Sequence, residues 1–356
     1  MLTNKIFNYQ FMPESAKLFL PADIEEDDIL FFDIETTGLS HRNSRVYLIG
    51  AALCTDGKWE MIQFLAQKEN EKEEYAVLEA FQSLCARKRC FLHFNGSTFD
   101  IPYLQHKYQS YRLTLPFKDA VSVDLYRTLR PLRTILQTEN FRQKSLEPLA
   151  GYRRQDAMDG KELIKVYRTY AKTGGQTLLN LLFLHNHDDV EGMGCLLAFG
   201  ALLALLRGNF RMRDITAVTD RAMDGSLLQE VLFTVKLPLS FPTRLSFSLP
   251  CAYVTLEKDC CKMKMPLLEG TLKYYYPDYK NLRPAANVLR CRPFMLQGRE
   301  CAQHSRLFYF CFLFLCVVSS FFSVFRSRLQ SFHTQADLFL FSVEVYNFCC
   351  NDLSYG

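Results

Sequence analysis

The stretch Ile29-Leu-Phe-Phe-Asp33-Ile-Glu35-Thr-Thr-Gly38 decides the fold that we expect. Four apolar residues in a row predict a buried strand, and the Thr-Thr-Gly turn ends it. Side chains alternate along a strand, so Asp33 and Glu35 should point to the same side. Two carboxylates at the end of a buried strand repel one another unless a cation joins them. A lone Asp-x-Glu would indicate a solvated turn, but the apolar run places this pair at the rim of a core.

Beyond this strand the chain alternates between strand and helix patterns. Two further strands follow directly, joined by an Asp56-Gly57 hairpin turn. The expected strands are residues 29–33, 45–55, 58–65, 90–94 and 121–125, and the expected helices are residues 70–87, 98–108, 146–150, 162–171 and 178–206. This order predicts an α/β fold with a five-stranded mixed sheet flanked by helices, parallel at its centre and antiparallel at its edge.

Composition changes along the 356 residues and indicates four parts. We expect a lead-in at residues 1–25, an α/β domain at 26–210, a small β-rich accessory region at 211–281 and an atypical tail at 282–356. Residues 307–325 carry no charge and are long enough to span a bilayer. From residue 291 onward, however, the chain holds six of its 13 cysteines and twelve of its 30 phenylalanines. This abrupt change favours a frameshifted or otherwise aberrant tail over a membrane anchor.

Charge and cysteine usage argue against several classes of protein. The chain has 42 basic and 38 acidic residues, which is too balanced for a histone-like polycation. No two of its cysteines have C-x-x-C spacing, so a zinc ribbon or a thioredoxin motif is not expected. Residues 1–17 lack the apolar run of a secretory signal. We therefore expect reduced thiols and a cytoplasmic location.

Two further groups of acids lie next to apolar segments. Asn95-Gly-Ser-Thr-Phe99-Asp100 follows an expected strand and opens a helix. Asp100 would lie in the first helical turn, where an acid is favourable in any helix, so a purely structural acid is an equal alternative. His185-Asn-His-Asp188-Asp189 lies within an apolar helix, where unpaired acids are costly. His185 and Asp189 share a helix face, and their apolar surroundings favour a site over an ordinary surface pair.

A mixed sheet would bring these groups together. Asp33 and Glu35 end the central strand, Asp100 starts the helix after the neighbouring strand, and Asp189 comes from a late helix packed across the sheet. Four carboxylates around one cleft form an all-oxygen site, which suits Mg²⁺ or Mn²⁺ rather than zinc. Two such ions about 4 Å apart can activate a water and stabilise the leaving oxygen of a phosphodiester.

Three motifs carry a resemblance to a known family. Asp33-x-Glu35, Asn95-x-x-x-Phe-Asp100 and His185-x-x-x-Asp189 resemble the motifs of the DEDD (DnaQ-like) 3′–5′ exonucleases of the ribonuclease-H-like superfamily. The bacterial YprB-type domain is more similar still, over residues 29–206, and the expected order of strands and helices matches that architecture. The resemblance implies a 3′–5′ exonuclease that binds single-stranded DNA or RNA ends and needs two Mg²⁺ or Mn²⁺ ions. It implies no organic cofactor.

The resemblance also implies a role for each matching residue. The metal ligands would be Asp33, Glu35, Asp100 and Asp189, with Asp33 bridging both ions. His185 would be the general base, since an imidazole titrates near neutral pH. The residues that border the terminal nucleotide or orient the second motif would be Thr36, Thr37, Leu39, Asn95 and Phe99.

The third motif combines features of two branches of the superfamily. One branch has a histidine five residues before the last aspartate, where this chain has Leu184. The other has a tyrosine four residues before it, where this chain has His185. One helix face must point at the metals, so we take His185 together with Asp189. We interpret His187 and Asp188 as flanking polar residues.

A local excess of basic residues leaves a second function open. The residues are Arg127, Arg130, Arg133, Arg142, Lys144, Arg153 and Arg154. They could contact a phosphate backbone, and a solvated face is equally compatible. The alternative function is therefore a catalytically weak ribonuclease-H-like module that binds nucleic acid, and a membrane partner is not expected. Asp124 is interpreted as a turn acid, and Tyr152-Arg-Arg-Gln-Asp156 as a helix boundary signal.

Overall fold

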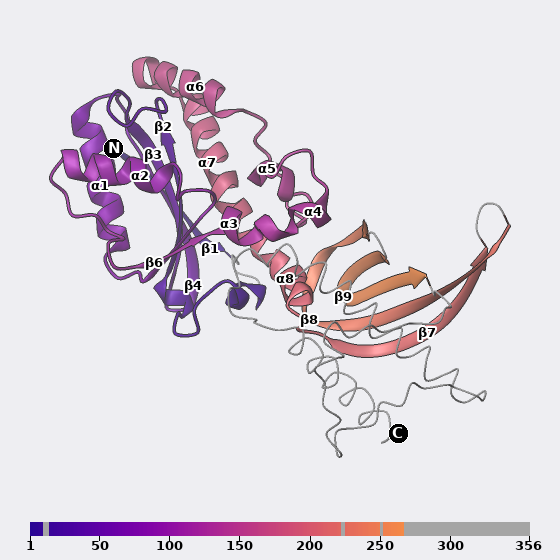
Figure 1. The fold of residues 1–356 in the computed structure, drawn as a ribbon. Helices are drawn as coiled ribbons and strands as arrows, with labels where there is room; N and C mark the ends of the chain where they lie inside the picture. Colours follow the sequence, from indigo (N-terminus) through magenta and orange to yellow (C-terminus); the bar gives the residue numbers. More distant parts are fainter. Residues whose placement is uncertain (10–13, 222–224, 250–251, 267–356) are drawn as a thin grey trace, which may run out of the picture. The chain divides into compact units, whose positions relative to one another are not determined.

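A six-stranded mixed sheet forms the centre of the α/β part of the protein (Figure 1). The structure is a computed structural model and describes residues 1–9, 14–221, 225–249 and 252–266. The strands lie in the order β1-β4-β3-β2-β5-β6 and are β1 (Leu2–Tyr9), β2 (Ile29–Thr36), β3 (Val46–Thr55), β4 (Lys58–Leu65), β5 (Cys90–His93) and β6 (Val121–Asp124). β2 pairs antiparallel with β3 and parallel with β5. The predicted mixed sheet is therefore confirmed.

The predicted number of five strands was wrong, because β1 adds a sixth within the expected lead-in. β1 pairs antiparallel with β4, and Leu2 lies opposite Leu65. Residues 2, 4 and 6 are half-buried, whereas residues 3 and 5 are exposed. This alternation is typical of an edge strand with one solvent-exposed face. Its apolar residues do not alternate regularly with polar ones, so the pattern in the sequence was too weak to distinguish it from a loop.

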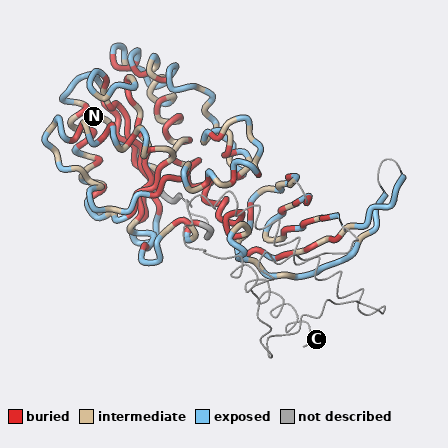
Figure 2. Tube along the Cα trace, viewed as in Figure 1, coloured by how far each residue is buried: buried red, intermediate tan, exposed pale blue. Residues whose placement is uncertain are grey.

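Helices cover both faces of this sheet (Figure 1). α1 (Glu71–Cys85) and α2 (Asp100–Ser110) lie on one face, and α6 (Gly160–Thr173) and α7 (Gln176–Leu196) lie on the other. Adjacent residues of β2 show the two environments. The ring of Phe32 packs against Phe81 of α1 with 5.5 Å between centroids, whereas the carboxylate of Asp33 accepts a hydrogen bond from Asn186 of α7. Figure 2 shows the sheet and the inner helix faces as buried.

The predicted hairpin turn joins β3 to β4 and fixes their register. Asp56 has a φ of 52° and Gly57 a φ of 72°, so both central residues have left-handed backbone. This is the geometry of a two-residue type I′ turn, whose twist matches that of the strands it joins. Thr55 consequently lies opposite Lys58, and Gly50 lies opposite Gln63 further along the pair.

Helix α7 is a core helix that packs very closely on the sheet. Residues 176–206, which include α8 (Gly200–Leu206), are long and apolar enough to cross a membrane, but 72% of that apolar window is buried inside the protein. A Cβ atom on Gly50 of β3 would lie 1.9 Å from Oδ1 of Asn186. Only glycine allows this approach. α7 therefore places polar side chains directly over the central strands.

The rest of the described chain consists of short helices and a second sheet. α3 (Leu125–Leu129), α4 (Arg133–Leu136) and α5 (Gln143–Leu146) lie between β6 and α6. The second sheet has the order β7-β8-β9 and contains β7 (Arg211–Arg221), β8 (Leu227–Leu249) and β9 (Ala252–Pro266). The chain divides into two compact units, and the six-stranded sheet lies in the first. The end of the expected accessory region (267–281), the expected tail (282–356) and its apolar segment (307–325) lie outside the described residues.

Candidate active site

Asp33 and Glu35 lie near the end of β2, and both face α7. Nδ2 of Asn186 donates a hydrogen bond to Oδ2 of Asp33 at 3.1 Å. Nε2 of His185 lies 3.4 Å from Oε1 of Glu35. Both acids are half-buried. The two carboxylates therefore lie at a partly open rim between the central strand and the helix.

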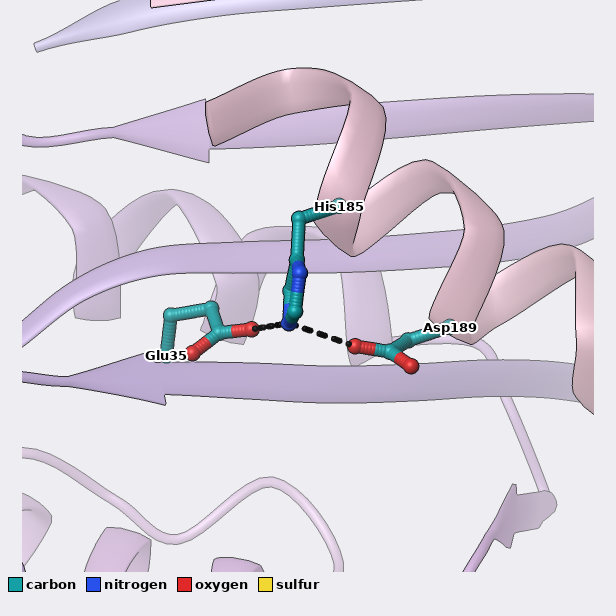
Figure 3. A group of neighbouring side chains, drawn as sticks. All are labelled: Glu35, His185 and Asp189. Carbon is teal, nitrogen blue, oxygen red and sulfur yellow. Dashed lines mark ion pairs between the residues drawn. The ribbon is translucent and has the colours of Figure 1, made fainter. Parts of the chain in front are cut away.

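His185 and Asp189 come from one face of α7, a single turn apart (Figure 3). Nε2 of His185 lies 3.3 Å from Oδ2 of Asp189. Together with Glu35 they offer three ligand-type atoms that all lie within 4.8 Å of one another. The structure thus brings the third motif against the first, through the i,i+4 spacing of the helix.

Asp100 joins the same cluster from the first turn of α2. Its side chain is buried, and burial is the main cause that raises its pKa to about 7. The charges of Asp124 and Asp189 raise the pKa further, while the backbone amides of Asp100 itself and of Ile34 oppose the shift. Because Ile34 belongs to β2, Asp100 lies beside the strand that carries the first two acids.

The acids of the three motifs oppose one another's ionisation. Burial is the largest cause that raises the pKa of both Asp33 and Glu35, and the charge of Asp189 is the next for each. Asp100 raises both pKa values as well. Acids placed in this way need a cation if all of them are to be charged. Their carboxylate oxygens are the donors that Mg²⁺ and Mn²⁺ prefer, so the residues present fit such ions.

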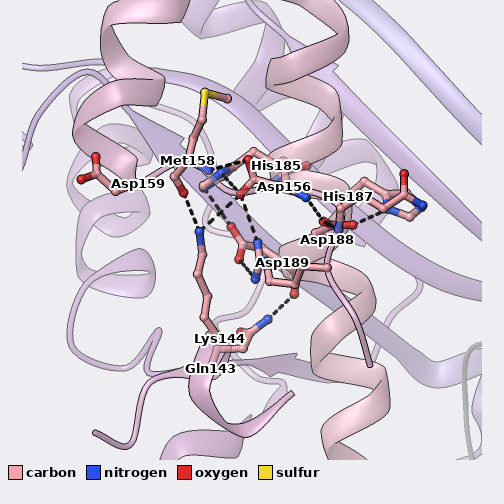
Figure 4. A network of polar contacts seen from close by, with 12 residues as sticks. Gln143, Lys144, Asp156, Met158, Asp159, His185, His187, Asp188 and Asp189 are labelled. Atoms are coloured by element: carbon pink, nitrogen blue, oxygen red, sulfur yellow. Dashed lines mark hydrogen bonds and ion pairs between the residues drawn. The ribbon is translucent and has the colours of Figure 1, made fainter. Parts of the chain in front are cut away.

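The loop before α6 contributes an acid that sequence analysis missed. Oδ2 of Asp156 lies 2.7 Å from Nδ1 of His185 (Figure 4). Glu35 lies near the other ring nitrogen, Nε2. The Asp156 side chain is only 2% exposed, and Nζ of Lys144 lies 3.3 Å from the same oxygen. The loop belongs to no helix or strand, so no periodic pattern marked the residue. The sequence indicates it only as part of a helix boundary.

Arg154 lies inside the protein, although the basic residues near it in the sequence suggested a solvated or phosphate-binding position. Its Nη1 atom lies 2.8 Å from Oδ1 of Asp189 and 3.0 Å from Oε1 of Glu147. The Arg154 side chain is 8% exposed, and Glu147 is fully buried. The charge of Arg154 is therefore used inside the protein. It holds Asp189 by one oxygen and leaves the other directed toward His185.

The side chain of Asp188, which the sequence indicates as a flanking polar residue, is buried and bonds to the loop before α6. Its Oδ2 atom accepts hydrogen bonds from the backbone amides of Gln155 at 2.7 Å and Asp156 at 2.8 Å, and its Oδ1 accepts one from the hydroxyl of Tyr152. Burial acts to raise the pKa of Asp188, but contacts with His187 and these donors hold it below its ordinary value. Asp188 therefore fastens the loop that carries Asp156.

A comparison with protein families identifies the architecture around this cluster. Residues 30–197 match the family model described as the RNase_H superfamily. They form a ribonuclease-H-like domain. The matched range begins in β2 and ends just after α7, so it contains every acid of the three motifs. No curated protein matches the sequence.

Solved structures similar to the chain include enzymes that act on nucleic acids. The family B DNA polymerase of Pyrobaculum calidifontis is 17% identical, with a TM-score of 0.40, and the match covers 50% of this chain and 25% of the polymerase. E. coli exonuclease I in complex with a dT13 oligonucleotide is 16% identical, with a TM-score of 0.30 and coverages of 58% and 54%. Brucella melitensis NrnC bound to pGG is 17% identical, with a TM-score of 0.32 and coverages of 52% and 78%. The chain thus spans about a quarter of the polymerase and about half of exonuclease I.

The residues expected to border a nucleotide have different environments in the ribonuclease-H-like domain. Leu39 is 87% exposed, in the turn after β2. Thr36 and Thr37 are buried, and their hydroxyls bond to the backbone of Gly38 and Arg45. These two hydroxyls are therefore used within the turn. Leu39 is the member of this group that is most open to a ligand.

The second motif of the domain is held in place through its backbone. Asn95 has a φ of 60°, and its backbone N–H donates a hydrogen bond to Oδ1 of Asp124 at 2.9 Å. Asp124 also accepts a hydrogen bond from the amide of Ser97, so it acts as the turn acid that the sequence predicts. Phe99 packs against Tyr103 with 5.5 Å between ring centroids. Asn95 and Phe99 as nucleotide contacts remain predictions.

Most of the basic stretch is exposed in the ribonuclease-H-like domain. Arg127 is exposed and lies 3.7 Å from Asp124. The other exposed arginines are Arg130, Arg133, Arg142 and Arg153. These four form no ion pair with an acid among the described residues. They are available to an anionic partner, unlike Lys144 and Arg154.

Proposed function

We propose that the ribonuclease-H-like domain is a metal-dependent 3′–5′ exonuclease that hydrolyses phosphodiester bonds at single-stranded nucleic-acid ends. The observation that carries this proposal is the meeting of carboxylates from three separate elements at one place. β2 supplies Asp33 and Glu35, α2 supplies Asp100, and α7 supplies Asp189. Burying these like charges together is costly without a function for them.

Asp33, Glu35, Asp100 and Asp189 would hold two Mg²⁺ or Mn²⁺ ions. When bound, such ions supply a water of lowered pKa and neutralise charge on the phosphate and the leaving oxygen. Arg154 supports this arrangement, because it contacts Oδ1 of Asp189 while Oδ2 faces His185 and the cluster. The site is therefore built from helix and strand residues with fixed orientations.

His185 would act as the general base. Its Nε2 atom faces Glu35 and Asp189, so a water near these carboxylates lies within reach of the imidazole. The proton of the attacking water would pass to Nε2. His187, by contrast, lies 3.5 Å from Glu191 on another side of α7. Of the two histidines, His185 is the one that the helix directs at the acidic cluster.

The substrate is proposed to be a single strand of DNA or RNA. Leu39, exposed in the turn after β2, would border the terminal base. The exposed arginines Arg130, Arg133 and Arg142 would contact backbone phosphates, which would make binding weaken as salt concentration rises. Matched DNA and RNA oligomers of one sequence would establish which strand is preferred.

The test is digestion of 5′-labelled oligomers by the full chain in Mg²⁺, in Mn²⁺ and in EDTA. We expect stepwise shortening from the 3′ end with either metal and no cleavage in EDTA. Asp33→Asn should lower the rate at least about 10²-fold, because one of the carboxylates that would hold the ions is lost. Asp119→Asn, at an exposed position, is the matched control and should cleave like the wild type. Full activity in Asp33→Asn would disprove the proposal.

A binding module without turnover is the second candidate. The observation in its favour is that Asp189 already has a basic partner for each oxygen, in Arg154 and His185. A site neutralised in this way would not need a metal to balance its charge. In that case the protein would retain labelled oligomers in a salt-sensitive manner, yet leave them uncut at every metal concentration.

A further inference from the structure

We propose that Asp156 is a positioning residue that holds His185 in one tautomer, with its proton on Nδ1 and a free lone pair on Nε2. The inference rests on the proposed function, because it assigns a partner to the proposed base. Its experimental test includes a measurement that does not depend on activity.

The contact between Asp156 and His185 is short and buried. Nδ1 of His185 lies 2.7 Å from Oδ2 of Asp156, and the two side chains are 5% and 2% exposed. The oxygen lies outside hydrogen-bond geometry for Nδ1, so the contact is an electrostatic one rather than a linear hydrogen bond. Catalytic contacts are often misaligned before a substrate binds. An unprotonated Nδ1 is partly negative and would be repelled by a carboxylate oxygen at this distance, so the contact favours a proton on Nδ1.

The carboxylate of Asp156 is fixed at both of its oxygens. Oδ1 accepts a hydrogen bond from the backbone amide of Met158 at 3.1 Å, and Oδ2 faces His185. Lys144 and Arg154 lie 3.3 Å and 3.8 Å from Oδ2. Two cations therefore lie close to the oxygen that faces the imidazole.

The loop that carries Asp156 is fastened to the helix that carries His185. Asp188, three residues after His185 on α7, accepts hydrogen bonds from the amides of Gln155 and Asp156 (Figure 4). The hydroxyl of Tyr152 donates to the other oxygen of Asp188 at 2.8 Å. The acid and the imidazole are therefore held by one helix, and movement of either relative to the other is restricted.

Selection of the tautomer matters because Nε2 also faces carboxylates. Glu35 and Asp189 lie 3.4 Å and 3.3 Å from Nε2. Without Asp156 they would draw the imidazole proton to Nε2, and a protonated Nε2 cannot accept a proton from water. A carboxylate at Nδ1 reverses this preference, as it does for histidines in other catalytic and metal sites.

Asp156→Asn is the most informative substitution. The side-chain oxygen of the new asparagine would still accept the hydrogen bond from the backbone N–H of Met158. Its side-chain NH₂ would then face Nδ1 of His185 and donate to it. This would force the proton to Nε2. We expect kcat to fall by about 10²-fold or more with KM nearly unchanged, since an equivalent exchange in a serine protease costs about 10⁴-fold. Asp159→Asn is the control, because asparagine caps a helix as well as aspartate does.

The tautomer itself can be measured by nitrogen-15 NMR on histidine-labelled full-length protein with Mg²⁺ at alkaline pH. His185→Gln identifies the His185 signals. We expect a protonated Nδ1 and an unprotonated Nε2 in the wild type and in Asp159→Asn, and the reverse in Asp156→Asn. A wild-type spectrum with a proton on Nε2 would overturn the inference without any variant. An active wild type with unchanged kcat in Asp156→Asn would overturn it too, and would leave the nuclease proposal standing.

Discussion

Asp189 has a basic group on each of its carboxylate oxygens. Nη1 of Arg154 lies 2.8 Å from Oδ1, and Nε2 of His185 lies 3.3 Å from Oδ2. The arginine contact is the shorter, and the guanidinium is also joined to the fully buried Glu147. Charge-assisted contacts of this kind are stronger than neutral ones, and they also fix the orientation of the carboxylate. Arg154 therefore determines which oxygen of Asp189 faces the acidic cluster.

Replacement of Arg154 should weaken both the fold and the site. In Arg154→Ala the buried Glu147 loses its ion pair, and breaking a buried pair costs roughly 3–5 kcal/mol. We expect the free energy of unfolding in urea to fall by about that amount. Arg153→Ala, at the exposed neighbouring position, should change it by less than about 0.5 kcal/mol. Equal stabilities of the two variants would contradict the internal role of Arg154.

Helix α7 shows which parts of the site could be predicted from the sequence. The i,i+4 spacing of His185 and Asp189 predicts a shared face, and the structure has this arrangement. The contact of Asn186 with Asp33 could not be predicted, because it depends on Gly50 in a different strand. Side chains that act across elements leave no mark in local periodicity.

The close approach of α7 to β3 leads to a second prediction. A Cβ on Gly50 would lie 1.9 Å from Oδ1 of the fully buried Asn186, so Gly50→Ala should force the helix away from the sheet. We expect a loss of about 1–3 kcal/mol of unfolding free energy, typical of an overpacked core. Gly160→Ala in α6 meets no atom within 4 Å and should be neutral or slightly stabilising. A Gly50→Ala protein as stable as Gly160→Ala would rule out this packing.

At the scale of the whole molecule, the sheet gathers residues that are far apart in the chain. The strong patterns were predicted well: residues 58–65 form β4 with the predicted ends, and residues 71–85 form α1. The segment from 137 to 159 was predicted poorly, because it is mostly loop and its side chains bond to distant helices. The ribonuclease-H-like architecture was therefore predictable. The residues that contact and orient the acidic cluster from this segment, Arg154 and Asp156, were not.

Burial of His93, a residue of strand β5, makes global stability depend on pH. His93 on β5 is 1% exposed, and its burial lowers its pKa to about 4 despite the nearby Asp124. Between about pH 4 and pH 6.5 the unfolded chain binds the proton and the folded chain does not. This residue should therefore lower stability as the pH falls through that window, by about 3 kcal/mol in full.

The variant His93→Gln isolates this contribution, since the raised pKa values of the site acids act in both proteins. We expect the unfolding free energy of the wild type to fall more steeply than that of His93→Gln between pH 6.5 and about pH 4. Urea unfolding at several pH values measures both slopes. Parallel slopes would show that His93 is protonated in the folded protein as readily as in the unfolded chain.

The most direct test of the central claim is to count the divalent ions that the folded protein binds. Titration of the full chain with Mn²⁺, followed by calorimetry and by the loss of the free-ion electron paramagnetic resonance signal, measures this number. Two ions per chain are predicted for the wild type and for Asp119→Asn, with binding weakened or lost in Asp33→Asn and Asp100→Asn. No binding by the wild type, or binding that Asp33→Asn leaves unchanged, would contradict a metal centre built from these acids.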